Sequence, residues 1–317
     1  MTQATRIATL SLNPAIDQTA EVSRFTAGAV NRVVWERADA GGKGINVAAF
    51  LAHAGLPVTA AGLLGRANDG PFNDLFARKD IADRCQRLAG STRVNVKIVD
   101  PVLDQVTDIN FPGLSPAADD LRQLETTLDA LCDDHDWFVL SGSVPAGVPA
   151  EIYADLIDRL RSRGRRLLLD ASDAPLAAAV GRGPDIIKPN IDELGELVGR
   201  RLTGQAAVLE AARSLVASGI GLVAVSMGAD GALFVEPGNA LLALPPRVEV
   251  KSTVGAGDAM VAGILAGTLR GLDLAGRARL ATAFSLAALG QVGPELPSMS
   301  IVESFTADVE IRPLDNH

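Results

Sequence analysis

The sequence predicts an α/β protein with a doubly wound, mostly parallel sheet of the Rossmann type and a small lid of β-strands. Short buried apolar stretches alternate along the chain with amphipathic helical patterns, which is typical of such a sheet. Aromatic residues make up only 4% of the chain, so the core must be aliphatic, as suits packed α/β layers. Two segments, about 18–40 and 92–112, alternate polar and apolar residues and predict the lid. Because no linker or internal repeat divides the 317 residues, we expect one domain over residues 1–317.

Composition and charge exclude several classes of protein. A hydrophobic content of 48% with 21% charged residues is that of a globular chain. The net charge of -9 argues against nucleic acid or an anionic membrane as a partner. The first 13 residues lack the pattern of a signal peptide and no apolar segment is long enough to cross a bilayer, which predicts a cytoplasmic protein. Cys85 and Cys132 are expected to be ordinary thiols, and none of the three histidines stands where a hydrolase triad needs one.

The first strand is predicted at residues 6–12 and is followed by turn residues at 13–17. Asp17 would then lie just past the carboxyl end of a strand, where ligands bind in open α/β sheets. Two interpretations of Asp17 stay open, an acceptor for the hydroxyls of a polyol and the side chain of an Asx turn. The segment 18–39 has no helical stripe and fits a pair of exposed strands.

A glycine turn at residues 40–44 leads into a helical pattern that ends at Gly55. Such a turn can bring backbone amides, including that of Gly42, against a ligand. Lys43 offers a point charge for a phosphate, and Asn46 can both donate and accept hydrogen bonds. The turn lacks the spacing of a Walker A loop and the third glycine of a dinucleotide fingerprint, so neither motif is predicted.

The segment 92–99 alternates polar and apolar residues and predicts a strand with one wet face. That face carries Arg93, Asn95 and Lys97, and two cations with an amide suit an anionic ligand. A plain solvated face is the alternative. Residues 106–111 are expected to pair with this strand as a hairpin.

In the middle of the chain, a helix is expected over 115–131, with Ser115 as its cap and Pro116 at its first position. A buried strand at 137–140 ends in small polar residues that include Ser143. Further elements are predicted as strands at 58–64, 167–170 and 185–188 and as helices over 70–78 and 149–163.

Two turns in the second half of the chain could face a nucleotide. Asn190 and Glu193 either form a capping box at a helix start or hold magnesium through water, because that ion prefers oxygen ligands and keeps much of its hydration. The turn from Ser226 to Gly231 lies between two strands and either flanks a nucleotide or is a plain β-turn.

The stretch 252–269 carries the strongest pattern in the chain. A glycine turn opens a buried helix, whose first amides lack internal partners and sit at the positive end of the helix dipole. Gly255, Ala256 and Gly257 can therefore wrap an anion, and Asp258 in the first turn is expected to stay ionised, as a general base needs. The alternative is a helix that merely starts with glycine and an acidic turn. A last apolar helix is expected over 279–289, and residues 309–314 are interpreted as one further strand.

Together these strings resemble the phosphofructokinase B family of the ribokinase-like superfamily over nearly the whole chain. The strongest likeness is the segment 252–258, which is similar to the C-terminal signature of the family. Six more strings support it in the same order along the chain, at 13–17, 42–48, 92–97, 141–145, 188–190 and 226–228. Within the family the chain is most similar to kinases of fructose 1-phosphate. Kinases of tagatose 6-phosphate share much of the pattern, and those of fructose 6-phosphate resemble the chain less at Lys43.

The resemblance implies transfer of the γ-phosphoryl group of ATP to the 6-hydroxyl of D-fructose 1-phosphate, with Mg²⁺ as cofactor and a monovalent cation as an open possibility. Asp258 would take the hydroxyl proton while the amides of residues 255–257 hold the developing charge. Lys43 and Arg93 would grip the existing phosphate together, at the end of the sugar far from Asp258. The other implied contacts are sugar contacts by Asp17, Gly42, Asn46 and Ser143 and nucleotide contacts by Lys188, Asn190, Glu193, Ser226, Gly228 and Gly231, with Asn190 and Glu193 also ordering Mg²⁺ through water.

Family likeness also implies a homodimer formed through the lid strands. Two alternatives to the fructose 1-phosphate kinase stay open at this point. One is a tagatose 6-phosphate or fructose 6-phosphate kinase, and the other is a sugar-phosphate sensor that binds without catalysis.

Overall fold

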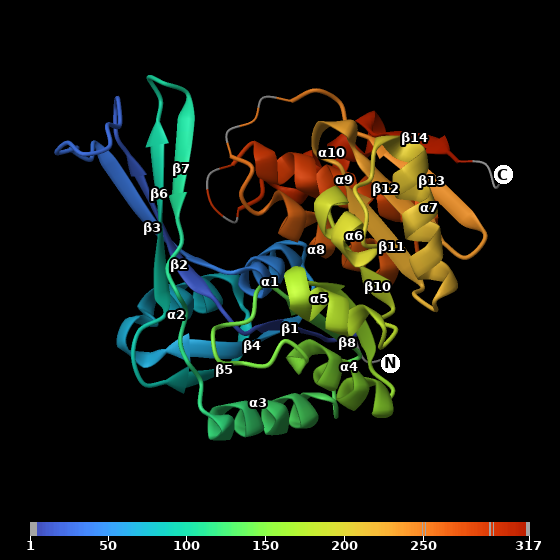
Figure 1. Ribbon diagram of the computed structural model, residues 1–317, viewed down its shortest axis with the longest axis horizontal. Helices are drawn as coiled ribbons and strands as arrows, with labels where there is room; N and C mark the ends of the chain where they lie inside the picture. Colours follow the sequence, from blue (N-terminus) through green and yellow to red (C-terminus); the bar gives the residue numbers. More distant parts are fainter. Residues whose placement is uncertain (1–4, 249, 251, 292, 294, 315–317) are drawn as a thin grey trace.

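The fold is built on one large sheet and one small sheet. The computed structural model describes residues 5–248, 250, 252–291, 293 and 295–314 (Figure 1). The large sheet has ten strands in the order β14-β13-β12-β11-β10-β9-β8-β1-β4-β5, and the run from β11 to β5 is parallel. Its strands are β1 (Ile7–Ser11), β4 (Val58–Gly65), β5 (Ala82–Leu88), β8 (Trp137–Ser141), β9 (Arg166–Asp170), β10 (Ile186–Ile187), β11 (Leu222–Ser226), β12 (Ala232–Glu236), β13 (Asn239–Leu244) and β14 (Glu310–Pro313).

Helices cover both faces of the large sheet, which confirms the predicted doubly wound α/β class. One hydrophobic cluster joins the sheet to α1 (Lys43–His53), α2 (Gly70–Lys79), α8 (Ala256–Leu269), α9 (Leu274–Leu289) and α10 (Met299–Asp308). A second cluster, on the other face, joins it to α3 (Ala118–Leu131), α4 (Ile152–Ser162), α5 (Asp173–Val180), α6 (Ile191–Leu197) and α7 (Gly204–Ala217). Successive residues of β1 face opposite clusters, because side chains alternate along a strand. Two single 3₁₀ turns complete the fold, η1 (Arg66–Asn68) and η2 (Gly228–Asp230).

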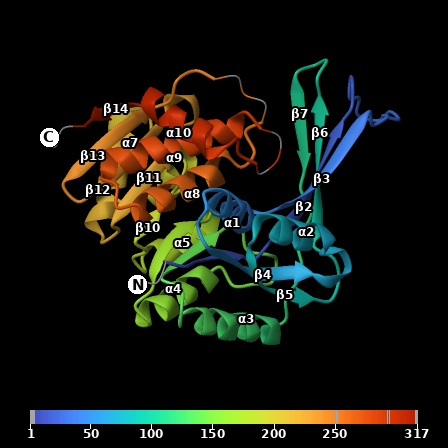
Figure 2. The same cartoon turned by 180° about the vertical axis from the view of Figure 1, so that it is seen from behind.

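The small sheet has four strands in the order β3-β2-β6-β7. They are β2 (Ala15–Glu21), β3 (Trp35–Gly41), β6 (Arg93–Asp100) and β7 (Gln105–Ile109). Figure 1 shows these strands projecting from the body as an arm, and Figure 2 shows the same arm from behind. The parallel strand pair β2–β6 brings Asp17 beside Asn95, so both side chains leave the same face of this sheet.

Several element boundaries differ from the sequence expectation. Asp17 is not a turn residue, because β2 begins at Ala15 and carries it as its third residue. The helix expected from Ser115 and Pro116 begins at Ala118, because the Asp120 carboxylate accepts a hydrogen bond from the Ala117 amide at 2.8 Å and closes the helix start there. The helix expected from residue 279 begins earlier, at Leu274.

The other sequence expectations have mixed outcomes. The strand interpreted at 309–314 is present as β14. Strand β5 was not expected, since its few apolar residues do not alternate with the charged and polar ones. Strand β13 and helices α5, α7 and α10 were not expected either. Both cysteines are free thiols. Among the helices of the described residues, none combines the length and the apolar character that a membrane span requires.

Candidate active site

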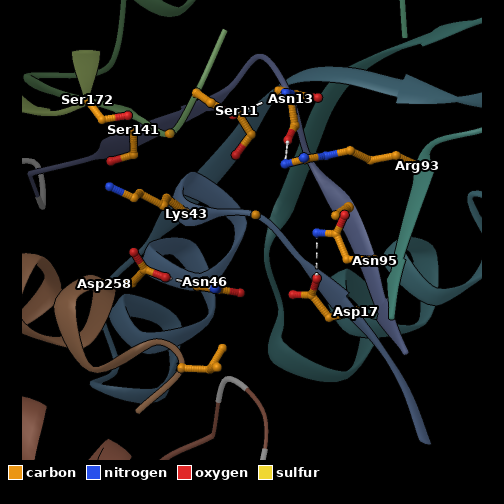
Figure 3. A pocket seen from close by; sticks show the side chains of 15 residues that line it. Ser11, Asn13, Asp17, Lys43, Asn46, Arg93, Asn95, Ser141, Ser172 and Asp258 are labelled. Carbon is orange, nitrogen blue, oxygen red and sulfur yellow. Dashed lines mark hydrogen bonds between the residues drawn. The ribbon is translucent and has the colours of Figure 1, made fainter. Parts of the chain in front are cut away.

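The carboxyl edge of the large sheet supplies the floor of a cavity of about 270 Å³ below the small sheet. Ser11, Ser141 and Asp170 end the neighbouring strands β1, β8 and β9 in one register row, so their side chains meet at this edge. The cavity is lined by Ser11, Asn13, Ala15, Asp17, Gly42, Lys43, Asn46, Arg93, Asn95, Ser141, Gly142, Ser143, Ser172, Val254 and Asp258 (Figure 3). It therefore brings together seven of the predicted residues: Asp17, Gly42, Lys43, Asn46, Arg93, Ser143 and Asp258.

The glycine turn before α1 places Asn46 against Asp258. Gly42 has a φ of 109°, and a Cβ there would lie 2.8 Å from the Cα of Pro14, so only glycine fits this close approach. Helix α1 starts at the next residue and carries Asn46 on its first turn. The Asn46 side chain is 5% exposed and its Nδ2 donates to Oδ2 of Asp258 at 2.8 Å. The turn thus orients the carboxylate that the sequence predicts as the base.

Asp258 lies in the first turn of α8, after Gly255 at the N-cap with a φ of 80°. Its side chain is 7% exposed. Burial raises the pKa of Asp258 to about 6, the nearby Asp170 charge adds to the rise, and the Asn46 hydrogen bond with Lys43 and Lys188 offsets part of it. With a pKa near 6 the carboxyl is still mostly ionised at neutral pH, as the sequence predicts, although desolvation and the Asp170 charge favour its neutral form. A pKa near the working pH is what a general base requires.

Charged groups gather at the Asp258 end of the cavity. Asp170, which closes β9, is 1% exposed, and its Oδ1 lies 3.2 Å from Nζ of Lys188 and 3.5 Å from Nζ of Lys43. The Asp170 charge, with a smaller contribution from Asp258, raises the pKa of Lys43, so its ammonium group stays protonated. Asp170 was not identified from the sequence, where the only signal is an acidic residue at the end of an apolar strand. We call Lys43, Asp170, Lys188 and Asp258 the charged quartet.

Lys43 does not form a pair with Arg93 as the resemblance implied. Figure 3 shows the Lys43 side chain directed toward Ser141 and Asp258 and away from Arg93. The difference arises because Asp170 provides the nearest opposite charge for the ammonium group. The two cations therefore lie at different ends of the cavity.

Arg93 lies at the other end, which we call the sugar end. Its guanidinium donates to the backbone oxygens of Asn13 at 2.9 Å and Pro14 at 3.3 Å, and burial lowers its pKa. Asn95 Nδ2 donates to Oδ1 of Asp17 at 3.1 Å. Burial also raises the pKa of Asp17, and the Asn95 hydrogen bond and the Arg93 charge hold part of that rise back. The small sheet thus supplies one carboxylate and one cation to the cavity.

Several buried polar atoms of the cavity have no hydrogen-bond partner among the described residues. They are Oγ of Ser11, Oδ1 of Asn13, Oδ1 of Asn46 and Oγ of Ser141. Leaving such an atom unpaired costs about 1–3 kcal/mol, so their grouping around one cavity suits a polar ligand that forms several hydrogen bonds. Ser11, Asn13 and Ser141 were not predicted as site residues, although each follows or ends a buried strand.

The predicted nucleotide residues lie outside the cavity. Asn190 and Glu193 form a capping box for α6, with Glu193 N donating to Asn190 Oδ1 and Asn190 N donating to Glu193 Oε2, both at 2.8 Å. Asn190 also bridges to Ser226, which joins the start of α6 to the turn that contains Gly228 and Gly231. Lys188 instead forms an ion pair with Asp170 and belongs to the charged quartet.

The described residues contain no group of three or more acidic, histidine or cysteine side chains that could enclose a metal ion. Mg²⁺ keeps several waters and binds through one or two carboxylates together with substrate phosphates. Magnesium binding by Asn190 and Glu193 stays a prediction.

The parallel sheet and the buried carboxylate at a helix start, beside two ammonium groups and a polar cavity, define a small-molecule phosphotransferase. The chain belongs to the pfkB family of carbohydrate kinases, which residues 10–300 match. It is 54% identical over 310 residues to the 1-phosphofructokinase of Rhodobacter capsulatus, covering 98% of both chains. It is 48% identical over 286 residues to the 1-phosphofructokinase of Xanthomonas campestris, covering 89% of this chain and 90% of the relative.

A solved structure has the same fold. The crystal structure of phosphofructokinase-2 from Escherichia coli in complex with potassium has a TM-score of 0.89 at 32% identity and covers 96% of this chain and 98% of its own. The tetrameric inhibited form of that enzyme is similar at a TM-score of 0.88, with the same identity and coverage.

Proposed function

We propose that the protein is an ATP-dependent kinase that phosphorylates the 6-hydroxyl of D-fructose 1-phosphate to give fructose 1,6-bisphosphate. The observation that carries the proposal is the position of Asp258. Its carboxylate shares one cavity with unpartnered hydroxyl and amide oxygens suited to a sugar. The 54% identity to a 1-phosphofructokinase supports the choice of sugar.

In the proposed reaction the sugar hydroxyl oxygen forms a bond to the γ-phosphorus of ATP. The bond from that phosphorus to the β,γ-bridging oxygen breaks, ADP leaves with the electron pair, and the hydroxyl proton passes to the Asp258 carboxylate. The amides of Gly255, Ala256 and Gly257 hold the charge on the transferred group, since they lie at the free N-terminus of α8. Magnesium, when bound near Asn190 and Glu193, supplies charge neutralisation for the nucleotide phosphates.

The binding roles follow the two ends of the cavity. Asp17, Gly42, Asn46 and Ser143 are proposed to contact the sugar hydroxyls, and Arg93 the phosphate already on the sugar. Glu193 and Asn190 are proposed to face the nucleotide phosphates, and the turn of Ser226, Gly228 and Gly231 to border the adenosine. ATP is a cytoplasmic metabolite, and both cysteines are free thiols, so the proposal places the protein in the cytoplasm.

We also propose that the small sheet is a lid on a single domain and that its outer face joins two copies of the chain. Asp17 and Asn95 leave the face toward the cavity, whereas Ile98 and Ile109 leave the opposite face, and Ile109 is 43% exposed. An exposed apolar sheet face is suited to a self-complementary interface.

Light scattering tests the dimer. The wild type should have twice the mass of one chain, and Ile109→Asp should shift the measured mass toward that of the monomer. A monomeric wild type would contradict this assembly.

One screen tests the function. ADP release is measured with Mg-ATP and fructose 1-phosphate, tagatose 6-phosphate or fructose 6-phosphate, and fructose 1-phosphate should have the highest kcat/KM. A strong preference for another sugar overturns the choice of substrate, and binding of a phosphosugar without ADP release would indicate a sensor. Repeating the assay with potassium replaced by choline tests whether a monovalent cation activates the enzyme, as the potassium in the structure of the Escherichia coli relative suggests.

A further inference from the structure

We propose that Asp170 is a positioning residue that holds the ammonium groups of Lys43 and Lys188 as a two-point clamp, and that both lysines contact the phosphoryl group during its transfer. This inference rests on the proposed kinase function. It reassigns Lys43 from the phosphate already on the sugar to the one being transferred. It also gives a function to a buried acid that the reaction scheme does not use.

The geometry of Asp170 is that of a shared anchor. Its Oδ1 lies 3.2 Å from Nζ of Lys188 and 3.5 Å from Nζ of Lys43, so one oxygen holds both cations. Asp170 itself is 1% exposed and does not line the cavity, so it cannot touch a substrate there directly. Any effect of Asp170 on the reaction must therefore pass through the two lysines and the field that it exerts on Asp258.

The two ammonium groups flank the start of α8. Nζ of Lys188 lies 3.5 Å from the position that a Cβ on Gly257 would occupy, so it sits against the turn whose free amides are proposed to receive the phosphoryl group. Lys43 lines the cavity, and its side chain is partly exposed. Asp258 and Glu193 both contribute to raising the pKa of Lys43, so both carboxylates lie within electrostatic reach of its ammonium group.

Charge balance explains the arrangement. One buried and one partly exposed ammonium group side by side would be costly without anions, and Asp170 and Asp258 balance them before a nucleotide arrives. Each ammonium group has three N–H donors, so it can keep its contact with Asp170 and still donate to a phosphoryl oxygen. Because the lysines are already in place, little reorganisation is needed when charge develops on the transferred group.

Lys43→Met gives the first test, because it separates the two possible roles of Lys43. If Lys43 is part of the clamp, Lys43→Met should lower kcat for fructose 1-phosphate about 10²–10³-fold, as for loss of one preorganised donor, while KM for the sugar stays within about twofold. Lys43→Arg keeps the charge and should recover part of kcat. If Lys43 instead held the phosphate already on the sugar, KM would rise and kcat would change little, and that result would overturn the proposal.

Asp170→Asn gives the second test. It should lower kcat by a similar factor and move the acid limb of the kcat–pH profile to lower pH, because the Asp170 charge raises the pKa of Asp258 while Asn46, Lys43 and Lys188 lower it. If Asp170 only maintained the fold, the substitution would reduce the amount of active enzyme without shifting the acid limb of the kcat–pH profile. A folded variant whose acid limb is unshifted would therefore contradict the proposal. If Asp170→Asn does not fold, the kcat and KM values of Lys43→Met decide alone.

Lys79→Met is the matched control. Lys79 also forms an ion pair with a carboxylate, 2.7 Å from Oε2 of Glu295, but it does not line the cavity. Its kcat and KM should stay within about twofold of the wild type; a loss of kcat equal to that of Lys43→Met would show that the effect is not specific to the clamp. The wild-type assay distinguishes failure of the proposed kinase function from failure of the proposed clamp. If the wild type is inactive on every phosphosugar, the kinase function is refuted. If the wild type is active and Lys43→Met has the same kcat, only the clamp is refuted.

Discussion

The two ends of the cavity differ in how their polar groups are satisfied. At the transfer end, the charged quartet holds two acids against two lysines, so its charges are balanced within the protein. At the sugar end, Arg93 is held by backbone oxygens, and the side-chain oxygens of Ser11 and Asn13 have no partner among the described residues. Oδ1 of Asn46 and both carboxylate oxygens of Asp170 at the transfer end also lack a hydrogen-bond partner among the described residues, so the contrast lies in the charges. The transfer end balances its own charges, whereas the sugar end offers the Arg93 cation to an anionic ligand. Changes at the first end should lower kcat, and changes at the second should raise KM.

The largest effect is expected from removing the base at the transfer end. Asp258→Asn keeps the size of the side chain but cannot take a proton, so kcat should fall at least about 10³-fold while ATP still binds. Steady-state assays and titration calorimetry measure the two quantities. Ordinary turnover by this variant would remove Asp258 from the proposed role.

The same substitution should increase stability above pH 7. The folded pKa of Asp258 is raised to about 6, so protonation stabilises the fold at low pH, and this contribution is lost as the pH rises through about 6. Above that pH the wild type carries a buried charge that costs up to about 3 kcal/mol, given about 1.4 kcal/mol per pKa unit, and Asp258→Asn does not carry it. Urea unfolding at pH 8 should show the variant to be more stable, with the difference shrinking toward pH 5. If Asp258→Asn were less stable than the wild type at pH 8, the buried charge of Asp258 would not destabilise the folded protein.

A change at the sugar end should affect binding instead. Asp17→Asn removes a charged acceptor for a sugar hydroxyl and should raise KM for fructose 1-phosphate about 10- to 100-fold, with kcat within a few-fold of the wild type. Glu36→Gln is the control, because Glu36 leaves the opposite face of the small sheet, where it accepts a hydrogen bond from Gln18. If Asp17→Asn lowered kcat alone, the proposed division between the two ends would be wrong.

The mildest perturbation is a change of pH alone, which should lower the activity of the wild type gradually. Because Asp258 must be deprotonated to act, kcat/KM should fall about tenfold per pH unit below pH 6. Lys43, with its raised pKa, should stay protonated over the whole range used. A profile that stays flat down to pH 4 would show that the Asp258 carboxyl is not desolvated in the working enzyme.

Much of this site could be predicted from the sequence, because glycine turns before α1 and α8 fix where those helices start. That placed Asp258 on a first turn and Asn46 in the helix after the other glycine turn, and the structure brings the two side chains into contact. The direction of the Lys43 side chain could not be predicted, since it depends on Asp170, a residue distant in sequence that only the strand order brings near. The rise in the pKa of Asp258 was missed for the same reason, because desolvation depends on the packing around it.

The most direct test of the central claim follows the phosphorus atoms themselves. Wild-type protein is incubated with fructose 1-phosphate and Mg-ATP, and ³¹P NMR records the products. We expect the γ-phosphate signal of ATP to be lost in step with the appearance of a second phosphate monoester, on carbon 6 of fructose 1,6-bisphosphate. Release of inorganic phosphate with the sugar unchanged, or no reaction at all, would contradict it.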